Sequence, residues 1–246
     1  MSPSAPRAVF FDVGNTLLYA DPSVSEVCRQ VLARSGHVRD LDSIDSFMPL
    51  VDAYYEERYA EDDAFWTDEE KTSSVWVGMY SLLCRKLGIE NEAVTIARAV
   101  YDEFGRPDRW ALYTDVKPAF ERLHAAGVAV GIISNWDSHL VSLLRGLGLG
   151  DLLGDIVSSA DVGLHKPDPR IFELACQRLG VAPADAAHVG DHHYADYLGA
   201  SALGMRALLI DRHGVEADHG VTPIHSLDEI DELLGIAKPQ AALDGW

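Results

Sequence analysis

Five short apolar runs stand out along the chain, and each has the length of a single buried β-strand. The runs show no alternation of polar and apolar positions, which is typical of parallel strands covered by helices on both faces. They are Ala8–Phe11, Val128–Ile133, Ile156–Ser158, Ala186–Val189 and Ala207–Ile210. The pattern therefore predicts a parallel sheet built from both ends of the chain.

Helical patterns separate the later runs. Each has apolar residues on one face, opens on an aspartate or proline and closes on a glycine. The three segments are bracketed by Pro118 and Gly127, by Asp137 and Gly148, and by Asp168 and Gly180, with Asp137 and Asp168 as helix caps. Strand and helix therefore alternate from about residue 116 onward, which predicts a doubly wound, Rossmann-like α/β core.

The stretch from Ala20 to about Trp110 breaks this alternation, because it contains no strand-like run. Its periodicity predicts four helices instead: Val24–Ser35, Ser43–Tyr59, Thr72–Leu87 and Glu92–Phe104. We therefore expect a catalytic core formed by residues 1–19 and 111–246, with a helical cap domain inserted as residues 20–110. The connecting hinges are expected near residues 15–20 and 105–114, and the second of these holds Gly105, Pro107 and charged residues.

Composition narrows the class of protein. The 246 residues carry a formal net charge of −19, which disfavours nucleic acid and anionic membrane as partners because both need a basic face. Cys28, Cys84 and Cys176 lack the spacing of a metal site and are expected to be reduced, buried thiols. The N-terminus does not have the pattern of a signal peptide or membrane span, so the predicted compartment is the cytoplasm.

Polar residues that could take part in catalysis or ligand binding follow the predicted strands. Ligands of doubly wound sheets bind beyond the carboxyl ends of the strands, so these residues are expected to converge on one crevice. In chain order they are Asp12-Val13-Gly14-Asn15-Thr16, then Ser134-Asn135, then Lys166, then Gly190-Asp191 and Asp196.

This ordered set resembles the haloacid dehalogenase-like (HAD) hydrolase superfamily. The resemblance covers both ends of the chain, and four motifs follow in order. The later motifs are SNWDSHL, GLHKPDPRIF and HVGDHHYAD, and they look especially similar to the subfamily with a helical cap inserted after the first motif. Any one motif is weak, but four in order, each after a predicted strand, are specific.

The resemblance implies a phosphatase mechanism. Asp12 would attack phosphorus and form an aspartyl-phosphate that water then hydrolyses. Ser134 and Asn135 would bind phosphoryl oxygens, the latter through the backbone, and Lys166 would neutralise charge on the phosphoryl group and on Asp12. Thr16 would order the loop that follows the nucleophile. The implied substrate is a small anionic, phosphorylated compound, while the oligomeric state is left open.

The resemblance also implies a Mg²⁺ ion. Its ligands would be Asp12, the backbone carbonyl of Gly14 and Asp191, with Asp196 holding the ion directly or through another ligand. A physical argument favours the same conclusion. Three carboxylates in one crevice would repel an anionic substrate, and Lys166 alone cannot neutralise them. A helix-capping role for Asp196 is the structural alternative.

Gly14 departs from the family pattern, because phosphatases usually have a second aspartate at this position as the proton donor. Loss of general acid catalysis costs about 10²–10⁴ in rate. A histidine could replace the donor, with His165, His192 and His193 as candidates, although each is more simply a solvated loop residue. Alternatively, the substrate could have a good leaving group, such as an aryl or acyl phosphate.

Other reactions remain open. Dehalogenases of the superfamily also lack the second aspartate, but their fourth motif does not normally carry Gly-Asp. Phosphonatases need a cap lysine, and Lys71 and Lys86 are available. A weakly active binding protein on the same fold is a further alternative.

Several other residues have simpler structural interpretations. The aromatic side chains of the insert are expected to pack inside the cap, and the arginines near its end are expected to face solvent. These residues are Tyr54, Tyr55, Tyr59, Trp66, Trp76 and Trp110, and Arg106 and Arg109. The function expected from the sequence is therefore magnesium-dependent hydrolysis of a small phosphorylated compound.

Overall fold

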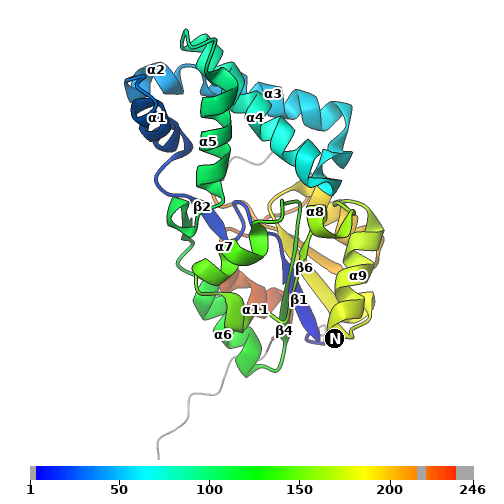
Figure 1. The fold of residues 1–246 in the computed structure, drawn as a ribbon. Coiled ribbons are helices and arrows are strands. Elements are labelled where there is room, and N and C mark those ends of the chain that lie inside the picture. The colour runs from blue at the N-terminus through cyan, green and yellow to red at the C-terminus, as the bar shows by residue number, and fades with distance from the viewer. Residues whose placement is uncertain (1–3, 215–219, 237–246) are drawn as a thin grey trace, which may run out of the picture.

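A five-stranded parallel sheet forms the centre of the computed structural model, which describes residues 4–214 and 220–236 (Figure 1). The strand order is β5-β4-β1-β6-β7. The predicted strands are all confirmed to within one residue at either end: β1 (Ala8–Phe11), β4 (Ala129–Ser134), β5 (Asp155–Ser158), β6 (Ala186–Gly190) and β7 (Arg206–Leu209).

Both faces of the sheet are buried, as the uniformly apolar strands predict. Val9 and Phe11 of β1 pack with α6 (Val116–Ala125), α7 (Leu140–Gly146) and α11 (Ile230–Leu233) on one face. Ala8 and Phe10 pack on the other face, with α9 (Pro169–Leu179) and α10 (Gly199–Ala202). Because successive side chains of a strand point in opposite directions, β1 supplies both cores and is held rigidly in the middle.

The helices of the core begin and end at identifiable signals. Helix α9 (Pro169–Leu179) has the predicted Asp168 cap and ends at Gly180, whose φ of 64° suits glycine. Helix α6 begins two residues before Pro118, because a proline in the first turn removes an N–H that has no helical partner. Helix α7 begins after His139, so the expected Asp137 cap is wrong. The remaining helices are α8 (Ser159–Val162), the π-turn η5 (His193–Leu198) and α10 (Gly199–Ala202).

A separate layer of helices stands above the sheet in Figure 1. We call α1 to α5, together with a 3₁₀ turn at 63–67, the helical unit. It has its own buried core, which includes Val31, Leu83, Ile96 and Val100. Its helices are α1 (Val24–Arg34), α2 (Leu41–Asp45), α3 (Met48–Glu61), α4 (Glu69–Lys86) and α5 (Ala93–Phe104).

The predicted length of one helix in this layer is wrong. The sequence pattern indicated a single helix over Ser43–Tyr59, whereas the chain bends at Ser46 and Phe47 between α2 and α3. Pro49 lies in the first turn of α3, where its missing N–H does no harm, and it cannot lie in the middle of a longer helix.

A small antiparallel sheet joins the helical unit to the core. Strand β2 (Leu18–Ala20) pairs with β3 (Trp110–Leu112), and the register places Leu18 opposite Leu112. The two chain connections therefore leave the core side by side. Short 3₁₀ turns at 107–109, 150–152, 183–185 and 227–229 complete the regular structure.

Cys28, Cys84 and Cys176 are buried and unpaired, as expected. Among residues 4–214 and 220–236, no helix combines the length and the apolar character needed to cross a membrane.

Candidate active site

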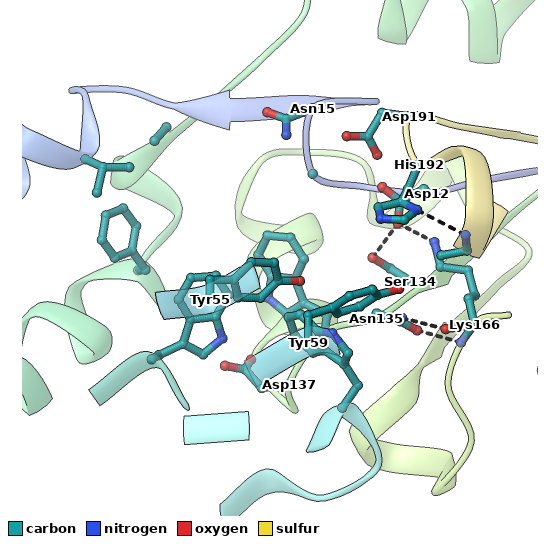
Figure 2. A pocket seen from close by; sticks show the side chains of 18 of the residues that line it. Asp12, Asn15, Tyr55, Tyr59, Ser134, Asn135, Asp137, Lys166, Asp191 and His192 are labelled. Atoms are coloured by element: carbon teal, nitrogen blue, oxygen red, sulfur yellow. Dashed lines mark hydrogen bonds and ion pairs between the residues drawn. The ribbon is translucent and has the colours of Figure 1, made fainter. Parts of the chain in front are cut away.

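A cavity of about 510 Å³ lies between the carboxyl edge of the sheet and the helical unit (Figure 2). The sequence had predicted that residues following different strands would meet at this edge. Seven of the predicted site residues line the cavity: Asp12, Gly14, Ser134, Asn135, Lys166, Asp191 and Asp196. Thr16 is fully buried and is not part of the lining.

Asp12 is fixed by the sheet and by the turn that follows it. Its backbone N–H donates to the Val189 carbonyl at 2.9 Å, which continues the pairing of β1 with β6. Beyond it, the Thr16 N–H donates to the Gly14 carbonyl at 2.6 Å, and Asn15 takes a left-handed conformation with a φ of 51°. Asparagine tolerates this region better than most residues, so the chain can turn sharply into β2.

Two donors bind one oxygen of the Asp12 carboxylate. The Ser134 hydroxyl donates to Oδ1 at 2.9 Å, and the Lys166 ammonium donates to the same atom at 2.6 Å. No hydrogen bond among the described residues is recorded to Oδ2, while Asp12 lines the cavity. The hydrogen bonds to Oδ1 therefore orient the carboxylate, and Oδ2 is available to act as a nucleophile or a metal ligand.

Lys166 is held at both its backbone and its side chain. The Asn135 side-chain amide accepts from the Lys166 N–H at 2.8 Å and donates to the Lys166 carbonyl at 3.0 Å. The ammonium also donates to Asp196 Oδ1 at 2.6 Å. Although burial alone would lower the pKa of Lys166, the carboxylates of Asp12 and Asp196 raise it above its usual value. The side chain is therefore a fixed positive charge.

Asp196 is a fully partnered carboxylate. Its Oδ1 lies 2.7 Å from Nε2 of the buried His188, and its Oδ2 accepts from the His192 N–H at 3.1 Å. Burial would raise the pKa of Asp196, but Lys166 and His188 outweigh burial and hold it below the usual range. The helix-capping alternative for Asp196 is wrong, since the His192 side chain caps η5.

Asp191 is the residue of the site that most needs a cation. Burial, together with the charges of Asp12 and Asp196, raises its pKa well above the usual value. Ligand oxygens of these three aspartates all lie within 4.8 Å of one another. Lys166 is the only lysine or arginine among the described residues of the cavity wall. Hard carboxylate oxygens with an excess of negative charge fit a divalent ion such as Mg²⁺.

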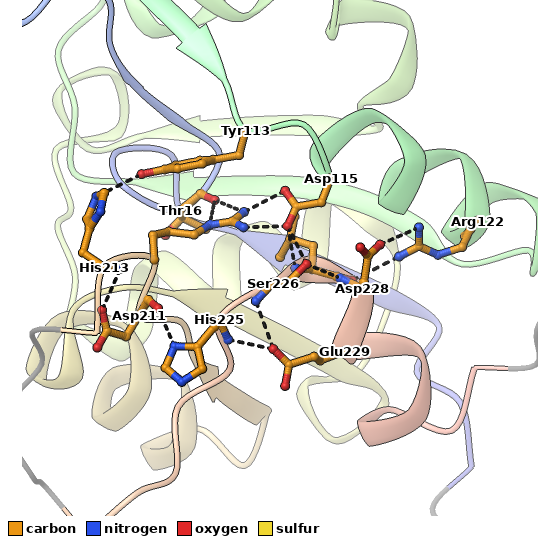
Figure 3. A network of polar contacts seen from close by, with 12 residues as sticks. Thr16, Tyr113, Asp115, Arg122, Asp211, His213, His225, Ser226, Asp228 and Glu229 are labelled. Carbon is orange, nitrogen blue, oxygen red and sulfur yellow. Dashed lines mark hydrogen bonds and ion pairs between the residues drawn. The ribbon is translucent and has the colours of Figure 1, made fainter.

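The loop after the nucleophile is held by Arg212, which the sequence did not single out. Figure 3 shows Thr16, Tyr113 and Asp115, the residues that Arg212 contacts. Arg212 donates to the Thr16 carbonyl at 2.7 Å and to Asp115 at 2.5 Å, and its guanidinium lies 4.2 Å from the centre of the Tyr113 ring. The Thr16 hydroxyl is buried without a partner among the described residues. Order in this loop thus comes from the Thr16 backbone, while the expected role of its side chain stays a prediction.

The three candidate proton donors occupy different places. His192 lines the cavity, with its ring 5.6 Å from the Tyr59 ring, and its Nδ1 accepts from the Ala195 N–H at 3.1 Å. The neutral ring therefore carries its proton on Nε2. His193 stacks on Tyr197, and His165 lies 3.1 Å from Asp63 of the helical unit.

Other cations of the insert lie away from the cavity wall. Lys71 and Lys86, the candidate phosphonatase lysines, are exposed and do not line the cavity. Arg106 pairs with Asp108, and Arg109 with Glu103, so neither arginine is positioned to meet a substrate anion.

The aromatic residues of the insert pack as expected but also have a second surface. Trp66 belongs to the buried core of the helical unit, and Tyr55, Tyr59 and Trp76 pack against that core. Together with Trp110, these side chains also line the cavity. The helical periodicity could not show this, because the same helix surface that buries apolar side chains also faces the cavity. Only Tyr54 of the predicted set lies outside the lining.

Polar contacts help to hold the helical unit against the core. The Tyr101 hydroxyl of α5 donates to Asp137 at 2.6 Å, and the Ser138 N–H donates to Glu69 of α4 at 2.9 Å. His165 and Asp63 add a further contact at 3.1 Å. Asp137, expected as a helix cap, instead accepts from Tyr101 and from the His139 N–H.

Gly190 leaves room for Asp196, which gives a testable prediction. A Cβ at Gly190 would lie 2.2 Å from the Cγ of Asp196 and would force this carboxylate away from Lys166. We expect Gly190→Ala to lower the free energy of unfolding by about 1–3 kcal/mol, the usual cost of overpacking. Thermal denaturation measures the change. Gly14→Ala is the control, because its Cβ would meet its nearest neighbour at 3.5 Å. Equal melting temperatures would contradict the prediction.

The fold and the site together define a doubly wound α/β enzyme that works at the carboxyl edge of its sheet. The chain belongs to the haloacid dehalogenase-like hydrolase family, whose model matches residues 6–204. It is 32% identical over 232 residues to haloacid dehalogenase-like hydrolase domain-containing protein 3 of Danio rerio, covering 92% of this chain and 94% of that protein.

Further relatives include both phosphatases and dehalogenases. The glyceraldehyde 3-phosphate phosphatase of Methanopyrus kandleri is 27% identical over 249 residues, covering 96% of this chain and 98% of its own. A 2-haloacid dehalogenase structure from Pseudomonas syringae is 26% identical with a TM-score of 0.63, covering 96% and 99% of the two chains. The magnesium-bound HAD hydrolase YfnB of Bacillus subtilis is 19% identical, has a TM-score of 0.77 and covers 95% and 100%, which shows a shared fold.

Proposed function

We propose that this hydrolase removes phosphate from a small phosphorylated compound through an aspartyl-phosphate on Asp12. One observation carries the proposal: Asp12 is oriented by Ser134 and Lys166 through a single oxygen, beside two further carboxylates. A reaction that used the Asp12 carboxylate alone would not need the charge of Asp191. The phosphatase relative in Methanopyrus kandleri supports the same assignment.

In the first step, Oδ2 of Asp12 attacks phosphorus and the bond to the leaving oxygen breaks. Ser134 and Lys166 hold the carboxylate in the attacking orientation and place positive charge next to the phosphoryl oxygens. The backbone after Ser134 would bind these oxygens, while the Asn135 side chain keeps Lys166 in position.

In the second step, water attacks the phosphorus of the aspartyl-phosphate and the bond to Asp12 breaks. The protons of the water leave with the phosphate, so the Asp12 carboxylate is restored. The buried Tyr59 hydroxyl has no partner among the described residues, and burial raises its pKa. It therefore keeps its proton and can donate a hydrogen bond to a phosphoryl oxygen.

A Mg²⁺ ion fits the acidic end of the cavity. Asp12, Asp191 and the Gly14 carbonyl would hold it, and Asp196 would support the set through its bonds to Lys166 and His192. When bound, the ion would supply positive charge that stabilises the phosphoryl oxygens. Without it, the three aspartates would repel an anionic substrate.

We further propose that residues 20–110 act as a cap over a core formed by 1–19 and 111–246. The paired strands β2 and β3 would serve as the hinge, and the contacts of Tyr101 and Glu69 with the core would hold the closed state. Closure would exclude water during the first step. The cytoplasm remains the predicted compartment, consistent with three unpaired cysteines.

Dehalogenation is the second candidate, favoured by Gly14, because a halide leaves without a proton. Asp191 counts against it, since a dehalogenase has no use for a third carboxylate in the site. The phosphonatase alternative lacks its lysine, because neither Lys71 nor Lys86 lines the cavity.

A substrate panel tests the proposal. Phosphate esters, phosphonates and 2-haloacids should be assayed with Mg²⁺ and with EDTA. We expect phosphate release from esters with Mg²⁺ and at least about 10²-fold less with EDTA, because charge stabilisation at the phosphoryl group supplies several kcal/mol. Restoration by added Mg²⁺ is the control. Halide release that ignores EDTA would replace the proposal with dehalogenation.

A further inference from the structure

Aromatic rings form much of the cavity wall. They come from three helices and a turn of the helical unit, from β3 and from the loop that follows β4. The rings belong to Tyr55, Tyr59, Trp66, Trp76, Tyr80, Tyr101, Phe104, Trp110 and Trp136. These rings line the same cavity as the three aspartates and Lys166, so the cavity has an aromatic part and a charged part.

Two polar atoms of this wall are already paired. The Trp110 ring N–H donates to the Phe104 carbonyl at 2.9 Å, and the Tyr101 hydroxyl donates to Asp137 at 2.6 Å. Glu56 also lines the cavity but is exposed to solvent. The wall therefore offers mostly ring surface, and the Tyr59 hydroxyl is its one buried polar atom without a partner among the described residues.

The rings already pack in the arrangements that aromatic groups favour. Tyr55 and Trp76 stack with centroids 5.7 Å apart, while Trp110 and Trp136 meet edge to face at 5.3 Å. A flat aromatic group entering the cavity would extend these contacts from both the helical unit and the core. A small aliphatic substrate would leave most of this surface uncovered.

The chemistry of the charged part of the cavity leads to the same class of substrate. A Cβ at Gly14 would lie 3.5 Å from Cζ3 of Trp136. The indole ring of Trp136 therefore lies next to the position where phosphatases of the family usually have the acidic side chain. A leaving oxygen here receives no proton from a carboxyl group. Phenols, with a pKa of about 10, can leave as anions far more easily than alcohols, which resemble water at about 16.

Resting on the proposed phosphatase function, we propose that the substrate is a phosphate monoester of an aromatic hydroxyl group. The aromatic ring of the substrate binds among Tyr55, Trp76, Trp110 and Trp136. Asp12 Oδ2 forms its bond to phosphorus as the bond from phosphorus to the aryl oxygen breaks. The electron pair leaves with the aryl oxide, which is protonated by solvent after release.

The first test separates leaving group from shape. With Mg²⁺ present, kcat/KM is measured for phenyl phosphate and for cyclohexyl phosphate, which is similar in size but leaves as an alkoxide. We expect phenyl phosphate to be favoured by at least about 10²-fold, the lower limit of what a missing acid costs. Acetyl phosphate, a small activated substrate without a ring, and phosphocholine, whose head group is a cation, complete the set.

The second test concerns the aromatic wall. Trp76→Leu should raise KM for phenyl phosphate by about five- to tenfold, since a lost aromatic contact is of that order, and should raise KM for acetyl phosphate by a clearly smaller factor. Trp76→Phe keeps a ring and should restore most of the binding. Tyr54→Leu is the matched control, because Tyr54 is an aromatic residue of the same helical unit that does not line the cavity. Circular dichroism confirms that each variant is folded.

The outcomes distinguish this inference from the function on which it rests. If no ester and no acetyl phosphate releases phosphate, the proposed phosphatase function is wrong. If acetyl phosphate is hydrolysed but phenyl and cyclohexyl phosphate react equally, the enzyme is a phosphatase and the aromatic substrate is wrong. Faster turnover of phosphocholine would mean that the rings bind a cation, and it would also overturn the inference.

Discussion

Asp12→Asn is expected to reduce phosphate release by roughly 10⁴-fold or more, the order seen when the nucleophile of an enzyme is removed. The amide oxygen of asparagine can still accept the hydrogen bonds of Ser134 and Lys166, which both use Oδ1 of Asp12. Lys166 also keeps its bond to Asp196. The variant should therefore fold normally, and the loss would come from the missing nucleophile.

Two measurements examine this expectation. Steady-state phosphate release compares the wild type with Asp12→Asn and with Asp108→Asn, a control at an exposed aspartate paired only with arginine. Acid quenching during turnover of a radiolabelled ester should trap phosphate on the wild-type protein and on the control, but not on Asp12→Asn. An Asp12→Asn variant that keeps a tenth of the activity would rule out the covalent mechanism.

The sheet could be predicted closely because its signal is local. Each buried strand is a run of apolar residues bounded by polar ones, and Phe10 and Phe11 pack on opposite faces of the same strand. Strands β2 and β3 could not be found in this way. They are three residues long and pair across about ninety residues of chain, so neither has a pattern without its partner. Pro49 was a local sign that a helix begins near Ser46 and Phe47, but the apolar periodicity continued through this segment and suggested one helix.

The acidic end of the site could also be predicted, because parallel strands bring their carboxyl ends to one edge. The residues that hold these site residues in position could not be predicted. Arg212 contacts the Thr16 carbonyl across 196 positions of sequence. His188 stands out as the histidine of an otherwise apolar strand, but the sequence does not show that it reaches Asp196. The contribution of the aromatic rings to the cavity wall was not predicted, since a ring on an insert helix can pack against the core and line a cavity at the same time.

Gly14→Asp is expected to raise kcat/KM for cyclohexyl phosphate by about 10²–10⁴-fold, the range that general acid catalysis supplies. The backbone at Gly14 is not left-handed, and its Cβ would make only an ordinary contact with Trp136. The new carboxyl would lie close to Asp12 and Asp191. Like charges raise the pKa of a carboxyl group, so the new group would keep a proton to donate near neutral pH.

The gain should be limited to substrates whose leaving group needs a proton. Phenyl phosphate should gain little, because its leaving group departs without a proton, and halide release should gain nothing. Gly14→Asn has nearly the same shape without an acidic proton, so it separates proton donation from packing against Trp136. If Gly14→Asp leaves the alkyl ester unchanged, another group already protonates the leaving oxygen, and His192, with its proton on Nε2 and its ring at the cavity wall, becomes the residue to replace next.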